Sequence, residues 1–129
     1  MPRLLKFFIM LLFCSSVFAI SVTFYCPTVN EIKNNLYPHW LPLYVDLEEL
    51  ASDADVNNFK LHITTFSKAE WNPLYLESGR CIYERDDSQN NIVLSRDAWS
   101  PVENEHWQWL QKKIAACDST EVVDCGFLE

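Results

Sequence analysis

Four cysteines most constrain what this chain can fold into: Cys26, Cys81, Cys117 and Cys125. An even number of cysteines in a small exported domain is typical of a disulfide framework. Four cysteines allow three pairings, and their spacing favours one. Cys117 falls at the end of a predicted helix and Cys125 in the short tail after it, so these two can close a local loop. The sequence therefore predicts the bridges Cys26–Cys81 and Cys117–Cys125.

The N-terminal segment indicates that these cysteines reach an oxidising compartment. Arg3 and Lys6 form a positive start, and residues 7–13 (FFIMLLF) form an apolar run. Val17 and Ala19 supply the small residues of a cleavage site. This pattern is typical of a secretory signal peptide, and the run is too short to cross a bilayer as a helix.

We therefore predict a signal peptide at residues 1–19 and a single exported domain at residues 20–129, in the periplasm or secreted. Phe13 precedes Cys14, and a bulky residue at that position argues against a lipid-modified cysteine. If the segment stays uncleaved, it anchors the same domain in the same compartment.

The charge of the predicted exported domain limits the kinds of partner that it can bind. The whole chain has ten basic and eighteen acidic residues. Without Arg3 and Lys6, eight basic residues face eighteen acidic ones, which gives a net charge of −10. This charge argues against nucleic acid and anionic membrane surfaces as partners and allows a basic protein partner. We expect no membrane span after signal cleavage.

The middle of the chain has the pattern of β-strands. Residues 59–66 (FKLHITTF) alternate between apolar and polar side chains, as a half-buried strand does. Residues 80–85 and 92–96 are β-prone runs on either side of a polar loop, which predicts an antiparallel hairpin.

Helices are expected on both sides of these strands. Thr28 or Asn30 can cap a short helix over residues 31–36. Near the C-terminus, Ser100-Pro101-Val102-Glu103 matches a capping box with proline at the first helical position. A longer helix is predicted from there to about Cys117. The fold class is then α+β: an antiparallel sheet with a short N-terminal and a longer C-terminal helix packed on one face.

The sequence carries no recognisable catalytic signature. With two glycines in the whole chain, a phosphate-cradling loop is nearly excluded. His62 and His106 are the candidate bases, but solvent-exposed or capping roles suit them better. The acidic pairs Glu48-Glu49 and Asp86-Asp87 fit a solvated surface. We predict a protein with no catalytic residue, and no metal or other cofactor.

The tryptophans are the stronger lead, since they exceed what a core of this size needs: Trp40, Trp71, Trp99, Trp107 and Trp109. Two residues two positions apart on a helix point in nearly opposite directions. The predicted helix places Trp109 in the core and turns Trp107 outward, unless the tail covers it. Trp107 and Trp40 are therefore the predicted interface residues.

Three segments resemble a family of small exported proteobacterial domains of unknown function. They are Cys26-Pro27 followed by Ile32 and Trp40, FSKAEW at residues 66–71, and Cys81-Ile82-Tyr83 before a returning strand. The similarity covers most of the chain after the signal, and its motifs are short. The family includes a periplasmic factor associated with the type IV secretion system of intracellular pathogens. The resemblance implies a periplasmic, non-enzymatic accessory role, and it implies no catalytic residue.

The sequence leads to two functional hypotheses. The first is a periplasmic accessory or binding protein that acts through protein–protein contact, with a secretion-system component or a second copy of itself as partner. An inhibitor of a periplasmic enzyme belongs to this same class. The alternative is a small glycan-binding or hydrolase-like domain that uses exposed tryptophans and carboxylates.

Overall fold

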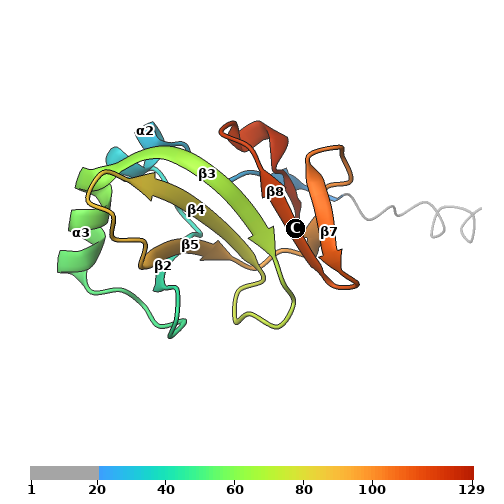
Figure 1. Ribbon diagram of the computed structural model, residues 1–129, viewed down its shortest axis with the longest axis horizontal. Helices are drawn as coiled ribbons and strands as arrows, with labels where there is room; N and C mark the ends of the chain where they lie inside the picture. The colour runs from blue at the N-terminus through green and yellow to red at the C-terminus, as the bar shows by residue number, and fades with distance from the viewer. Residues whose placement is uncertain (1–20) are drawn as a thin grey trace, which may run out of the picture.

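The computed structural model describes residues 21–129, and its fold is mostly β (Figure 1). The larger of two antiparallel sheets has six strands in the order β2-β5-β4-β3-β8-β7. Their bounds are β2 Leu41–Tyr44, β3 Ile63–Trp71, β4 Gly79–Arg85, β5 Ile92–Arg96, β7 Trp107–Gln111 and β8 Ile114–Asp118. The predicted signal peptide lies outside the described residues.

A second, three-stranded sheet has the order β1-β9-β6. Its strands are short: β1 Thr23–Phe24, β6 Ser100–Pro101 and β9 Phe127–Leu128. The strand that comes last in the chain, β9, therefore lies between the other two, and it pairs antiparallel with both.

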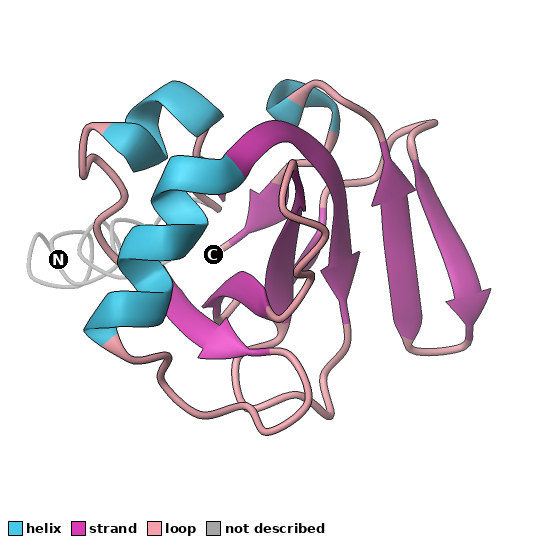
Figure 2. Cartoon of the chain, turned by 60° about the vertical axis from the view of Figure 1, so that its left-hand side comes forward, coloured by secondary structure: helices cyan, strands magenta, loops and turns pink. Residues whose placement is uncertain are grey.

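Two short α-helices and one 3-10 turn complete the described fold. Helix α2 (Val29–Lys33) begins at Thr28, whose side chain forms a capping box with Glu31. Helix α3 (Asp53–His62) is capped by Ser52 and runs directly into β3 (Figure 2). The 3-10 turn η1 (Val122–Asp124) precedes β9. A short N-terminal helix is present, but it covers Val29–Lys33 rather than the predicted residues 31–36.

Both predicted disulfides are present. Cys26 is bonded to Cys81 and Cys117 to Cys125, and all four residues are buried. The Cys26–Cys81 bridge ties the segment between β1 and α2 to the middle of β4. Buried side chains from both sheets form one core cluster around Phe127.

The predicted C-terminal helix is wrong. The predicted α+β fold class is wrong as well, because the described fold is mostly β. Residues 100–118 form β6, β7 and β8 instead. Ser100 and Pro101 pair with β9, where proline is tolerated because β6 is an edge strand. Residues of β8 pair with β3 on one side and β7 on the other. These long-range ladders outweigh a capping signal that is purely local.

The predicted hairpin is confirmed, because β4 and β5 pair antiparallel through residues 79–81 and 94–96. The predicted strand over residues 59–66 is only half right. Its first four residues close helix α3, and β3 begins at Ile63. Phe59 is nonetheless buried, because the last turn of α3 packs it against Tyr83.

Candidate docking surface

Trp107 and Trp40, the predicted interface residues, both lie in the core. Trp107 is 7% exposed, its Nε1 donates to the carbonyl oxygen of Gly126 at 3.0 Å, and its ring packs on Phe127. Trp40 is 6% exposed and packs edge-on against Phe24 and Phe127. The prediction that Trp107 faces outward is therefore wrong, because it depended on a helix that does not form.

Trp109 has the exposed position instead. On strand β7 it points to the same side of the sheet as Trp107, since side chains two apart on a strand share a face. Phe127 of the small sheet packs on Trp107, whereas Trp109 is 54% exposed. Its ring packs edge-on against Trp71, with the centroids 5.9 Å apart. The two indoles extend the aromatic core to the surface.

Trp99 extends this aromatic region across a hollow. It is 79% exposed, while its backbone N–H is held by the carbonyl oxygen of Leu128 at 2.7 Å. A hollow of about 400 Å³ separates it from Trp71. We call this feature the Trp99 hollow. Its lining residues are Trp71, Pro73, Ser78, Asp97, Ala98, Trp99 and Glu129.

The floor of the Trp99 hollow is fixed by hydrogen bonds. The buried Ser78 hydroxyl lies 2.8 Å from Asp97 Oδ1 and 2.8 Å from the carbonyl oxygen of Ala98, and it accepts from the Ala98 N–H. The indole Nε1 of Trp71 donates to the same Ala98 carbonyl at 3.0 Å. The backbone below Trp99 is therefore held at both ends, which favours a preformed surface.

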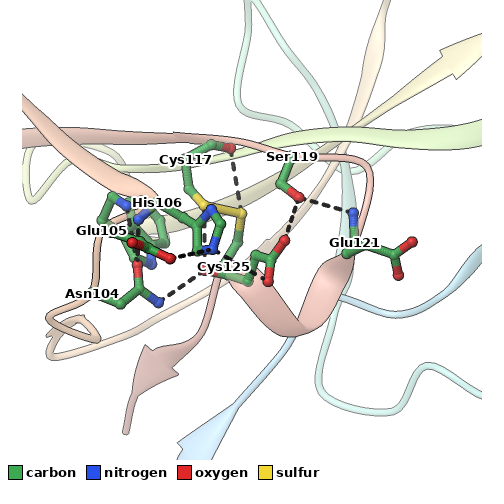
Figure 3. Close-up of polar contacts among 9 residues, drawn as sticks. Asn104, Glu105, His106, Cys117, Ser119, Glu121 and Cys125 are labelled. Carbon is green, nitrogen blue, oxygen red and sulfur yellow. Dashed lines mark hydrogen bonds and ion pairs between the residues drawn. A yellow bond between two sulfur atoms is a disulfide. The ribbon is translucent and has the colours of Figure 1, made fainter.

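A polar cluster beside the Cys117–Cys125 bridge could be mistaken for a catalytic triad (Figure 3). The Ser119 hydroxyl donates to Asp124 Oδ2 at 2.8 Å, and His106 Nε2 lies 3.5 Å from Asp124 Oδ1. In a catalytic triad the histidine contacts the serine and removes its proton. Here the aspartate lies between them, so His106 is not placed to remove the proton of the Ser119 hydroxyl. The cluster ties η1 to the neighbouring loops.

His62, the other candidate base, contacts a carboxylate rather than a nucleophile. His62 Nδ1 is 2.6 Å from Asp86 Oδ1 at the end of α3. Next to it, Arg85 binds Asp87 through two hydrogen bonds of 2.9 and 2.7 Å, and this guanidinium holds the pKa of Asp87 below its usual value. These contacts fasten the β4–β5 loop. Glu48, from the other acidic pair, is bound by Arg80 at 2.8 Å.

Two further features of residues 21–129 bear on function. They contain no group of three or more His, Cys, Asp or Glu side chains placed to hold a metal ion. No helix among them has the length and apolar character needed to cross a membrane.

The sequence does contain a pattern typical of a strand around Trp107 and Trp109, which the prediction of a helix did not take into account. Residues 107–111 read WQWLQ, in which two aromatics alternate with glutamine, as in a half-buried strand. With that period, Trp107 and Trp109 share a face, and only their distance along the strand decides which one the small sheet covers. No sequence pattern indicates that Trp99 is exposed, because its position depends on a contact between the turn after β5 and Leu128.

Comparison with known proteins adds no relative. No protein-family model matches the sequence, and no curated protein or solved structure matches it significantly. The resemblance to exported proteobacterial domains stays a prediction.

Proposed function

We propose that this chain is an exported, non-enzymatic binding domain that docks a protein partner at the Trp99 hollow. The observation that carries the proposal is Trp99 itself: a large aromatic side chain, 79% exposed, on a backbone that hydrogen bonds hold in place. Exposed tryptophans next to pockets are frequent anchors of protein interfaces.

The surroundings of Trp99 favour a particular kind of partner segment. Trp71 and Pro73 offer apolar walls, while Asp97 and Glu129 contribute carboxylates. An apolar segment that carries a basic residue complements both features. The net charge of −10 that remains without the predicted signal peptide favours the same partner at long range, because it attracts basic surfaces before contact.

The resemblance to exported domains suggests which partner to test first. A periplasmic component of a type IV secretion system belongs to the same compartment as the predicted exported chain. The two disulfides fit that compartment, since it keeps cysteines oxidised.

The test is capture of partners from crosslinked periplasm with the wild-type chain and with Trp99→Ala. Loss of an anchor tryptophan should reduce recovery of a true partner by about tenfold or more. Leu61→Ala is the matched control, because Leu61 is also an exposed apolar residue but lies on α3. Equal recovery with Trp99→Ala would contradict docking at this hollow.

A glycan ligand is the second candidate, and the lining of the hollow gives it specific support. Indole faces beside carboxylates can stack on a sugar ring and accept its hydroxyl hydrogen bonds. Titration with peptidoglycan fragments and oligosaccharides would then quench tryptophan fluorescence in a saturable way. The quenching should vanish in Trp99→Ala. An unchanged emission would exclude this candidate.

A further inference from the structure

A second hollow adjoins the Trp99 hollow. Its volume is about 450 Å³, and Asp97 and Glu129 line both hollows. We call it the His39 hollow, and its other lining residues include His39, Leu41, Glu77 and Arg96. Because the two hollows share two lining residues, they are two parts of one groove.

The His39 hollow differs from the Trp99 hollow in its charge. Its lining includes the carboxylates of Glu77, Asp97 and Glu129, together with the guanidinium of Arg96. That guanidinium is held in place, because it lies 3.8 Å from the ring centroid of Phe24 and its Nη2 is 3.8 Å from Glu129 Oε1. Three negative charges against one positive charge leave two unbalanced, so the hollow attracts a basic side chain.

The carboxylate of Asp97, which lines both hollows, has a fixed orientation. The backbone N–H of Ser78 donates to Asp97 Oδ1 at 3.3 Å, and the Ser78 hydroxyl lies 2.8 Å from the same oxygen. Within residues 21–129 no hydrogen bond is made to the other oxygen, Oδ2. A carboxylate that is already ordered loses little side-chain entropy when it binds a cation.

An extended segment can present one side chain to each hollow. In such a segment the side chains of residues i and i+2 lie on one face, about 7 Å apart. The indoles of Trp71 and Trp99 suit an apolar side chain, whereas the carboxylates of the His39 hollow suit a basic one. Arginine suits these carboxylates better than lysine, because its planar guanidinium can bond to more than one of them at once.

We propose that the groove binds an extended protein segment of the pattern apolar-x-arginine, with the apolar side chain in the Trp99 hollow and the arginine in the His39 hollow. The guanidinium then donates to Asp97 Oδ2 and to the neighbouring carboxylates. This inference rests on the proposed docking at the Trp99 hollow and adds what the docked segment has to carry.

Short peptides with blocked ends test the pattern. Gly-Ser-Leu-Ser-Arg-Ser-Gly and Gly-Ser-Arg-Ser-Leu-Ser-Gly cover both directions along the groove, and the same peptides with glutamine in place of arginine are their controls. In NMR titrations the better arginine peptide should shift the indole signals of Trp71 and Trp99 together with the backbone amides of His39 and Leu41. Its glutamine counterpart should bind about tenfold more weakly, because it cannot form charge-assisted hydrogen bonds.

A charge variant of the protein tests whether the arginine reaches the His39 hollow. Glu77→Gln should weaken binding of the arginine peptide about three- to fivefold and leave binding of the glutamine peptide unchanged. Glu103→Gln is the matched control, because it removes the same charge from an exposed residue that lines neither hollow. The two variants together separate a contact in the groove from the effect of net charge.

Three results would overturn the inference: no binding of either arginine peptide at millimolar concentration, equal affinity for the arginine and glutamine peptides, or shifts confined to one hollow. An oligosaccharide that shifts the signals of both hollows where the peptides do not would overturn it too. Partner capture that depends on Trp99 but not on Glu77 would remove only this inference and leave the proposed function standing. Capture that does not depend on Trp99, together with peptide binding across both hollows, would contradict the proposed function and keep the preference of the groove.

Discussion

At the scale of single residues, the two tryptophans of β7 differ in burial and should differ in their effect on stability. Trp107→Ala should lower the free energy of unfolding by about 3–5 kcal/mol, because it empties a buried aromatic site and removes one of the two donors to the Gly126 carbonyl, leaving the Val102 N–H. Trp109→Ala should lower it by only about 1 kcal/mol, since its ring is half exposed.

Urea unfolding of both variants measures this difference. Trp107→Phe is the informative control, because it keeps an aromatic ring against Phe127 but removes the indole donor. If both alanine variants lost a similar amount of unfolding free energy, Trp109 would contribute as much to packing as Trp107, and the predicted difference would be wrong.

Tyr83 makes stability depend on alkaline pH. Its hydroxyl donates to the Pro27 carbonyl at 2.5 Å, and burial, followed by the charge of Glu31, raises its pKa well above the ordinary 10.0. The folded state then favours the neutral phenol. The stability from this preference is complete below the unfolded pKa and is lost as the pH rises above it.

We expect the free energy of unfolding to fall above about pH 10. Tyr83→Phe lacks the ionisable group, so its stability should fall less over the same range, although it starts lower for want of the hydrogen bond. Urea unfolding at a series of pH values measures both slopes. Parallel slopes in the two proteins would assign the alkaline loss to other groups.

At the scale of elements, the two disulfides should contribute unequally. They close loops with sequence separations of 55 and 8 residues. In the chain-entropy model these loops correspond to about 4 and 2.5 kcal/mol. Replacing Cys26 and Cys81 by alanine should therefore destabilise the protein more than replacing Cys117 and Cys125. Thermal unfolding of the two double variants gives the order, and the reverse order would contradict the loop-length argument.

The features predicted correctly from the sequence are those that depend on neighbouring residues or on the number of cysteines. Both bridges were predicted correctly although Cys117 lies on β8 and not at the end of a helix, and alternation around a polar loop was enough for the β4–β5 hairpin. The capping pattern at Ser100–Glu103 failed because the competing partner of Ser100 is Leu128, far along the chain. The tryptophan assignment failed with it, since the choice of period decided which indole faced the core.

At the scale of the whole molecule, both sheets should unfold as one unit. Trp107 from the large sheet packs on Phe127 from the small one, and the Cys26–Cys81 bridge joins the N-terminal segment to β4. A shared core of this kind favours a single cooperative transition. Tryptophan fluorescence and far-ultraviolet circular dichroism should give coincident urea curves. A separate early transition in fluorescence would indicate that the small sheet opens by itself.

Because β9 lies between β1 and β6, its position also affects the order in which the core can assemble. A ribosome delivers the N-terminal residues first, so β1 and Trp40 emerge long before Phe127, the ring on which both β1 and Trp40 pack. Both cysteines of the Cys26–Cys81 bridge also precede β9 in the chain. The aromatic core cannot close until residues 127–128 arrive between β1 and β6. We therefore expect β9 to be required for closing the aromatic core between the two sheets.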